Sequence, residues 1–392
     1  MCALKNIDRE IDPFPLYARM RKDNPVYYDA QTHHWNVFRY EDVQRVLSDY
    51  EMFSSQFAGD PNDPSQPFAA AMITTDPPKH RELRSLVTQA FTPRAVEAMA
   101  PRIRQIVHEQ LDLVRGKDTF DVIADLAVPL PVIVIAEMMG IPVEDRGSFK
   151  KWSDQVVGLA NVAGEFNYDA FADNSGAIME MAGYFFQMIE HRKTNPGEDL
   201  ISGLVKAEVD GRKLETIELL GFCLLLLVAG NETTTNLIGN AMLTFSEHPD
   251  DWRRLREDPS LLPGAIEEVL RYRSPVQSMF RVAKPGARLG STELPEGARL
   301  VAWIGAANHD EDQFPKAEAF QIDRSPNRHL AFGQGIHFCL GAPLARLEAK
   351  IALTEMLERM RTVELMPGAN LERVPSTLVY GLKHLPIHAS MG

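Results

Sequence analysis

Ala331-Phe-Gly-Gln-Gly-Ile-His-Phe-Cys-Leu-Gly341 encloses a single cysteine, Cys339, among glycines directly ahead of a helical pattern. Pro343 suits the first turn of a helix, and apolar residues follow it at helical spacing: Leu344, Leu347 and Ile351. A thiol at a helix start feels the positive end of the backbone dipole, which favours the thiolate. Glycines allow backbone N–H groups to approach sulfur or a large flat ligand closely. The stretch therefore predicts a metal-bound thiolate.

The alternative interpretation is a glycine-rich turn in which Cys339 is a small buried hydrophobe, the usual role of a lone cysteine. Against it stands the complete ten-residue pattern Phe-Gly-x-Gly-x-His-x-Cys-x-Gly, from Phe332 to Gly341. This pattern resembles the haem-binding loop of the cytochrome P-450 monooxygenases. The resemblance implies a heme b cofactor (iron protoporphyrin IX) with Cys339 as the axial thiolate of the iron. It also implies that His337 pairs with a haem propionate.

Composition limits the possible partners and the compartment. The 392 residues carry a net charge of −13, which argues against nucleic acid or an anionic membrane as the main partner. Three widely separated cysteines imply no disulfide framework and fit a reducing compartment, so a cytoplasmic location is expected. The longest apolar run, 219–230, is shorter than the roughly 20 residues that span a bilayer, and it is interpreted as a core helix.

Two further segments carry cationic side chains that match the family. Asp76 is predicted to cap a helix in which His80 and Arg84 share a face at i and i+4. A solvated helix face is the alternative on spacing alone, but the resemblance to the family's His-x-x-x-Arg implies that both bind haem propionate. Arg281, in a predicted strand over 279–282, lies where the family places another propionate ligand. A hairpin is predicted over 289–304.

A long central helix is predicted over 214–245, and it contains Ala229-Gly-Asn-Glu-Thr-Thr-Thr235 directly after the apolar run. A glycine, an acid and three threonines are poor helix formers, so either a kinked or capped helix or a functional, locally loosened site is expected there. The stretch resembles the family's Ala-Gly-x-Glu-Thr. The resemblance implies that Glu232 and Thr233 deliver protons to bound oxygen.

The remaining motifs follow in the family's order. Glu268 and Arg271 match its Glu-x-x-Arg, an internal ion pair to which Arg324 is the implied third partner. The resemblance also implies the substrate-pocket residues, which are mostly apolar: Val228, Ala229, Val276 and Leu378. A small or medium hydrophobic substrate is therefore expected.

The implied fold is mainly α: a single cytochrome P-450 domain over 1–392 with a small β-rich subregion. The haem is expected between the long central helix and the helix after the cysteine loop. The implied reaction inserts one oxygen atom from O₂ into the substrate, with electrons from a ferredoxin and its reductase, because the chain has no flavin or nicotinamide fingerprint. Arg346 and Lys350 are candidates for the docking face.

Three other functions stay open at this point. A peroxide-driven peroxygenase would use the same fold without electron partners, and it is typically associated with loss of the acid–alcohol pair. A non-catalytic haem-binding sensor would not need Glu232 and Thr233. A thiol hydrolase built on Cys339 would need a base and an oxyanion site, and only His337 supports it.

Overall fold

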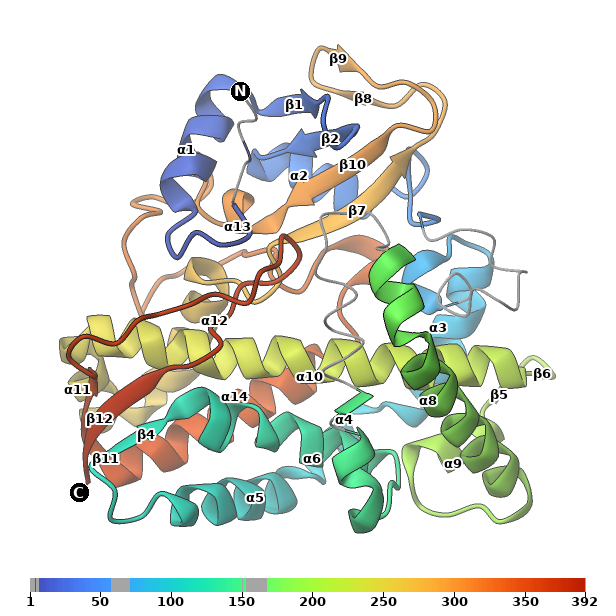
Figure 1. Ribbon diagram of the computed structural model, residues 1–392. Coiled ribbons are helices and arrows are strands. Elements are labelled where there is room, and N and C mark those ends of the chain that lie inside the picture. Colours follow the sequence, from blue (N-terminus) through green and yellow to red (C-terminus); the bar gives the residue numbers. More distant parts are fainter. Residues whose placement is uncertain (1–3, 5–6, 58–70, 150, 153–167, 392) are drawn as a thin grey trace.

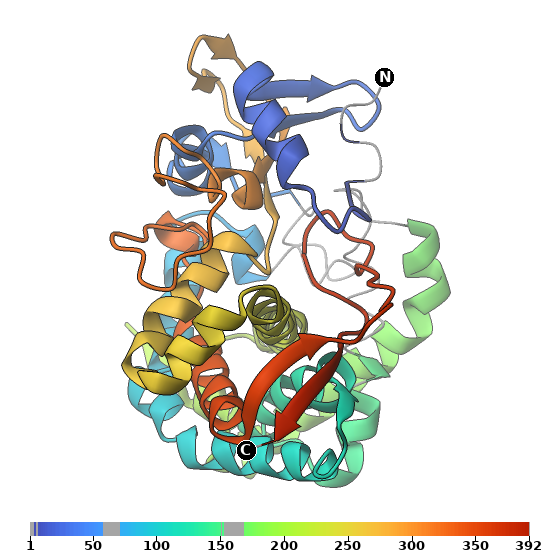
Figure 2. The same cartoon turned by 90° about the vertical axis from the view of Figure 1, so that its left-hand side faces the viewer.

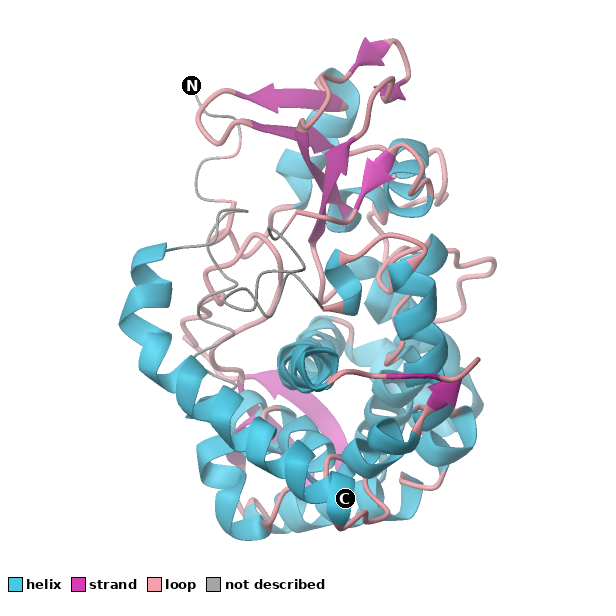
Figure 3. Ribbon diagram, turned by 90° about the vertical axis from the view of Figure 1, so that its right-hand side faces the viewer, coloured by secondary structure: helices cyan, strands magenta, loops and turns pink. Residues whose placement is uncertain are grey.

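A computed structural model describes residues 4, 7–57, 71–149, 151–152 and 168–391 (Figure 1). Helices form the lower part of the molecule, and a twisted sheet with its covering helices forms the upper part (Figure 3). The helices are α1 Phe14–Asp23, α2 Tyr40–Ser48, α3 Lys79–Ala90, α4 Pro93–Glu97, α5 Ala100–Leu113, α6 Pro129–Met138, α8 Tyr168–Thr194, α9 Leu200–Lys206, α10 Thr216–Glu247, α11 Pro249–Glu257, α12 Leu262–Tyr272, α13 Ile304–Ala307 and α14 Ala342–Arg359.

The largest sheet joins strands from the N-terminal segment to strands from 278–303. Its strand order is β1-β2-β10-β7-β3, and β10 runs parallel to β2 and antiparallel to β7. The strands are β1 Val26–Asp29, β2 His34–Val37, β3 Phe53–Ser54, β7 Ser278–Ala283 and β10 Arg299–Trp303. A second sheet has the strand order β11-β12-β4, with β11 Met360–Leu365, β12 Pro386–Met391 and β4 Thr119–Asp121. Two short hairpins pair β5 Glu208–Val209 with β6 Arg212–Lys213, and β8 Arg288–Leu289 with β9 Thr292–Glu293.

The helix α10 runs through the middle of the helical part, and Figure 2 looks along it. Its start is fixed by a capping box in which Glu215 and Glu218 satisfy each other's backbone N–H groups. Within the described residues, α10 alone is long and apolar enough to cross a membrane. It packs against α6, α8, α12 and α14, so its length serves the core. The predicted central helix is confirmed, two residues later at each end.

The helix α14 begins at Ala342 with Pro343 in its first turn, as predicted, and packs against α10, α12 and α5. The cysteine loop thus ends at a rigid helix that lies alongside the central one. The rigid start of α14 therefore holds the cysteine loop, where the sequence predicts the functional site.

Next to this site a buried ion network fixes the irregular segment that leads into the cysteine loop. Arg271 donates to both carboxylate oxygens of Glu268 at 2.9 and 2.8 Å, and Arg324 adds two bonds of 3.0 Å. Arg271 also donates to the carbonyls of Asn308 and Ala317 at 2.9 and 2.8 Å. Glu268 and Arg271 are fully buried, which confirms the predicted internal ion pair.

Two local predictions are wrong. Asp76 does not cap α3, which begins at Lys79 after Pro78; the Asp76 carboxylate instead accepts the N–H of Ser55 at 2.9 Å. The hairpin predicted over 289–304 is also absent as such, because β8 pairs only with β9 while β10 pairs with β7 and β2. A partner distant in the sequence replaces the local one for Asp76 and for β10, whereas β8 pairs with its near neighbour β9.

Candidate functional site

The cysteine loop is held against α2 by glycine geometry. Gly333 and Gly335 both have φ near +73°, the left-handed region that favours glycine. A Cβ on Gly335 would lie 2.7 Å from the Cα of Ser48, so no larger residue fits. The loop closes with a hydrogen bond of 2.9 Å from the Cys339 N–H to the carbonyl of Phe332. The side chain of Cys339 is exposed.

The protein alone does not hold Cys339 as a thiolate. Although solvent reaches the Cys339 side chain, the protein atoms crowded around the sulfur desolvate it and raise the thiol's pKa, and the opposing effects of the Gly341 N–H, Arg84 and the Ala342 N–H are smaller. The expectation that the helix start would favour the thiolate is therefore outweighed by desolvation. A metal cation at the sulfur reverses this balance, since a coordinating thiol is deprotonated.

Four donor side chains from three segments gather near this loop. The rings of His80 (α3) and His337 (loop) lie 4.2 Å apart between centroids. Burial and then Arg84 lower the pKa of His80 to about 4, and burial and then Arg281 lower the pKa of His337 to about 3. Burial also lowers the pKa of Arg281 (β7) to about 10. The structure thus brings together all four residues predicted to hold propionates.

These four residues fit a dianionic cofactor. His80 Nε2 is buried without a hydrogen-bond partner, and the Arg281 guanidinium donates to the adjacent carbonyl of Phe280 at 2.7 Å. Leaving a buried donor unsatisfied costs about 1–3 kcal/mol, so the cluster is complete only with acceptors added. Arg84 donates to the carbonyl of Phe338 at 2.9 Å, which places its guanidinium next to the cysteine loop. Two carboxylates, as on haem, match this donor set.

Sequence reasoning missed the residues that support the cluster. Asp76 accepts from Ser55 N–H and from Ser54 Oγ at 2.7 Å, and Lys284 lies 3.2 Å from its carboxylate. Ser55 Oγ is in turn 2.9 Å from His337 Nε2. These contacts lower the pKa of Asp76, although burial acts the other way. No local pattern connects residues 54–55 with 337, so only the fold reveals the link.

The predicted acid and alcohol, Glu232 and Thr233, are adjacent on α10 and form different hydrogen bonds. Thr233 Oγ donates to the carbonyl of Ala229 at 2.6 Å, and Glu232 Oε1 accepts from Asn236 Nδ2 at 3.2 Å. The helix continues through this stretch, so the expected local loosening is not present. The Thr233 hydroxyl instead donates its hydrogen bond within the helix, and its oxygen lone pairs stay available as acceptors.

Of the predicted pocket residues, Val276 and Leu378 lie side by side. Val276 forms a β-bridge with Val379, and the N–H of Gln277 donates to the carbonyl of Leu378 at 2.7 Å. Ala229 is exposed, on α10 four residues before Thr233. The side chain of Val228 lies outside the described residues.

The two candidate docking residues, Arg346 and Lys350, differ in whether their charge is already paired within the protein. Arg346 forms a two-bond ion pair with Glu267 at 2.6 and 2.8 Å, and its guanidinium lies 4.4 Å from the ring centre of Phe332. Burial alone would raise the pKa of Glu267, but the hydrogen bonds from Arg346 and His329 lower it to about 2. The charge of Arg346 is thus compensated, whereas Lys350 is exposed.

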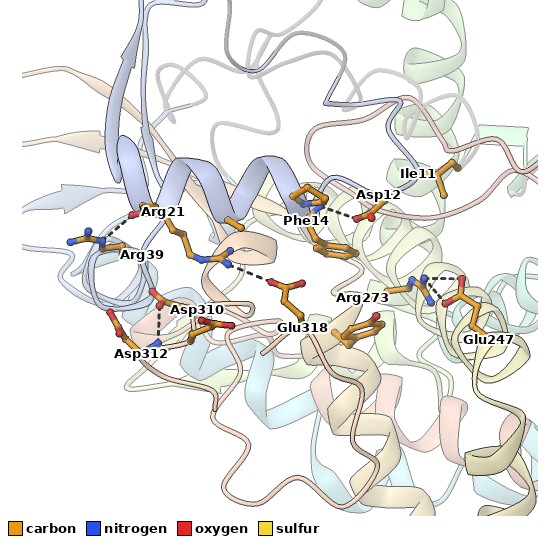
Figure 4. A pocket seen from close by; sticks show the side chains of 15 residues that line it. Ile11, Asp12, Phe14, Arg21, Arg39, Glu247, Arg273, Asp310, Asp312 and Glu318 are labelled. Carbon is orange, nitrogen blue, oxygen red and sulfur yellow. Dashed lines mark hydrogen bonds and ion pairs between the residues drawn. The ribbon is translucent and has the colours of Figure 1, made fainter. Parts of the chain in front are cut away.

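A separate cleft of about 860 Å³ lies between α1 and the segment after α13 (Figure 4). Four of its charged residues form two ion pairs: Arg21 lies 3.6 Å from Glu318, and Arg273 lies 2.8 Å from Glu247. None of the predicted site residues lines this cleft. The cysteine site therefore stays the candidate functional site.

Comparisons with known proteins agree with this geometry. A family model described as Cytochrome P450 matches residues 22–389. The putative cytochrome P450 YjiB of Bacillus subtilis (strain 168) is 43% identical over 380 residues, 97% of this chain and 94% of that protein. Substrate-free CYP109E1 from Bacillus megaterium is 42% identical with a TM-score of 0.91, covering 97% of this chain and 100% of the other. CYP109E1 in complex with testosterone is 43% identical with a TM-score of 0.87, covering 96% and 99%.

Proposed function

The chain belongs to the cytochrome P450 family and is a haem-thiolate monooxygenase, and we propose how its own residues serve that reaction. A haem held through the Cys339 sulfur would supply an iron centre for activating O₂ and inserting one oxygen atom into the substrate. The observation that carries the proposal is the buried, unpartnered Nε2 of His80 beside the cysteine loop. A carboxylate of the haem would supply the hydrogen-bond acceptor that this nitrogen lacks.

We assign the two haem propionates to His80, Arg84, Arg281 and His337. Before carboxylates bind, burial and the neighbouring arginines lower the pKa of His80 to about 4 and that of His337 to about 3, and a neutral imidazole offers one N–H donor. The two arginines supply the positive charge that buried carboxylates require. The Ser55–His337 contact restrains the imidazole orientation, so Ser55 is a positioning residue.

Proton delivery is assigned to Glu232 and Thr233. Thr233 Oγ donates to the carbonyl of Ala229, which leaves its lone pairs to accept a hydrogen bond from a water. Glu232, restrained by Asn236, is the adjacent acid that exchanges protons with water. No finding favours the peroxygenase or the sensor.

We propose a medium-sized hydrophobic substrate, in a pocket lined by Val228, Ala229, Val276 and Leu378. Support comes from CYP109E1, which binds testosterone and corticosterone in solved complexes. A polycyclic molecule of that kind is the first probe for this chain. Terpenoids, fatty acids, aromatics and macrolides complete the screen, which is read as the spin-state shift of the haem.

The source of electrons is proposed to be a ferredoxin with its reductase, docking where Lys350 is exposed. Family members generally need an external redox partner. The chain has 41 Lys and Arg against 54 Asp and Glu, so an exposed cation such as Lys350 stands out on a mainly acidic protein and could attract an acidic partner. We further propose that residues 1–392 form one domain, and that the protein is soluble and cytoplasmic.

The central test is the spectrum of the reduced, CO-bound protein. We expect the red-shifted Soret band of a thiolate-ligated iron in the native protein. Cys339→Ser should lose that band and retain less haem, because an alcohol is a far poorer anionic ligand. Cys223→Ser is the matched control, since Cys223 is buried in α10 and should not matter. A normal thiolate band in Cys339→Ser would refute the assignment.

A further inference from the structure

Arg373 is a buried arginine whose hydrogen bonds all go to main-chain carbonyls. Its exposed fraction is 3%. One terminal nitrogen donates to the carbonyls of Ile7 and Glu10 at 2.9 and 2.8 Å. The other donates to the carbonyls of Ser376 and Val379 at 3.1 and 3.2 Å. The side chain therefore joins the N-terminal segment 7–11 to the C-terminal loop 373–382.

Two other contacts make the same connection. Tyr380 OH donates to the carbonyl of Ile11 at 2.7 Å, and the N–H of Ser376 donates to the carbonyl of Asp8 at 3.3 Å. The guanidinium of Arg373 lies 4.6 Å from the ring centre of Tyr380, a cation–π distance. We call these contacts the terminal clasp: Arg373, Tyr380 and Ser376 holding segment 7–11.

The clasped loop is the one that carries Leu378. Ser376 Oγ accepts the N–H groups of Leu378 and Val379, both at 3.1 Å. The opposite edge of the loop is fixed by the Gln277 N–H on the Leu378 carbonyl and by the bridge between Val276 and Val379. The position of Leu378 and Val276 thus depends on the loop being held from both sides.

The N-terminal segment is itself anchored. Ile7 and Tyr17 are buried in one hydrophobic cluster, and Tyr17 OH donates to Gln277 Oε1 at 2.8 Å. Phe14 stacks on the ring of His309 at 4.2 Å between centroids, and Figure 4 shows Phe14 above the cleft described earlier. The match to the family model begins only at residue 22. The clasp therefore uses residues of this chain that the family pattern does not cover.

We propose that Arg373 is a specificity-determining positioning residue, which sets where Leu378 and Val276 stand in the substrate pocket by clasping segment 7–11. The inference rests on the proposed assignment of these two residues to the pocket. A buried charge solvated by four carbonyls is well suited to this role, because the planar guanidinium fixes the direction of each bond. A lysine, with one nitrogen, cannot span the same four acceptors.

The test uses three variants of the full-length holoprotein: Arg373→Lys, Tyr380→Phe and the control Arg9→Lys, whose side chain is 77% exposed. Hydrogen exchange should accelerate in peptides 7–12 and 373–382 together in the first two variants and stay unchanged in the control. Tyr380→Phe keeps the ring and removes one hydrogen bond, so it tests the clasp even if Arg373→Lys folds poorly.

Pocket shape is read from two ligands that coordinate the iron, imidazole and the bulky azole clotrimazole. The ratio of their dissociation constants cancels effects on the iron itself and reports contacts with the pocket wall. We expect the ratio to change about threefold in Tyr380→Phe, on the scale of one hydrogen bond, and about tenfold in Arg373→Lys. The thiolate CO band should be the same in all variants.

Leu378→Ala separates this inference from the assignment on which it rests. In that background the effect of Arg373→Lys on the ratio should shrink to less than about twofold, because coupled residues are non-additive. If Leu378→Ala alone leaves the ratio unchanged, the pocket assignment fails, and the inference with it. If Leu378→Ala shifts the ratio but Arg373→Lys and Tyr380→Phe do not, or if exchange stays unchanged in both, the inference alone is overturned.

Discussion

Glu268→Gln is the substitution whose effect can be worked out most fully from the structure. Glu268 is fully buried and carries one negative charge against the two guanidinium groups of Arg271 and Arg324. It also accepts the N–H of Gln321 at 3.0 Å and the side-chain amide of Asn327 at 3.1 Å. A glutamine has nearly the same shape, but it leaves two buried positive charges uncompensated and turns one acceptor into a donor.

Breaking a buried ion pair in this way costs about 3–5 kcal/mol. With an unfolding entropy of about 2.1 cal/mol/K per residue, a protein of this length should lose about 4–6 °C in apparent Tm. The assay is thermal and urea unfolding of the ferric holoprotein, followed by tryptophan fluorescence and by the Soret band. Haem should be lost at the same midpoint, because the segment held by Arg271 leads into the cysteine loop.

Glu267→Gln is the matched control, since Glu267 is the preceding residue on α12 and also binds an arginine. Its side chain is 31% exposed and that of Arg346 is 37% exposed, so solvent screens the pair, and despite the lowered pKa of Glu267 we expect it to contribute about 1 kcal/mol or less at neutral pH. The expected loss in apparent Tm is about 1 °C. If Glu268→Gln lost no more stability than Glu267→Gln, burial would not be what makes this network important.

Three further outcomes are expected. Thr233→Val should leave reduction intact but lower the product formed per reduced cofactor and raise peroxide release, and wild-type coupling with two unrelated substrates would argue against the hydroxyl's role. Lys350→Glu should slow reduction by a ferredoxin more at low than at high salt, and an effect on the reduction rate that does not change with ionic strength would exclude Lys350 from the docking site. Burial raises the pKa of Glu348, whose Oε2 is unpartnered, to about 8, so the folded state holds a proton that the unfolded chain releases near its ordinary value. Stability should therefore fall as pH rises from about 4.5 to 8, and Glu348→Gln should remove that slope in unfolding curves taken at pH 6 and 8.5.

The features that local sequence carries were predicted well. The cysteine loop and α14 followed from glycine, proline and helical spacing, and the family motif gave the cofactor. The central helix was predicted within two residues, since its apolar run is long. The buried Glu268–Arg271 pair followed from the family's motif, because i and i+3 lie on one helix face.

What failed, or was missed, depends on partners far away in the chain. Asp76 resembles a helix cap in sequence, yet Ser54, Ser55 and Lys284 occupy its carboxylate. Arg346 resembles a free surface cation until Glu267, 79 positions earlier, is seen to bind it. Arg373 gave no signal at all, because its acceptors are main-chain carbonyls that every residue possesses. Such contacts are set by topology and leave no residue pattern.

The order β1-β2-β10-β7-β3 has a consequence for how the protein is made. On the ribosome, β1, β2 and β3 emerge more than 200 residues before β7 and β10, the strands that lie between β2 and β3. Until then β2 and β3 have unpaired edges, which are templates for pairing with other chains. Pairings of such high sequence separation form slowly. Production of this enzyme should therefore respond to slower synthesis, lower temperature and chaperone supply more than to haem supply alone.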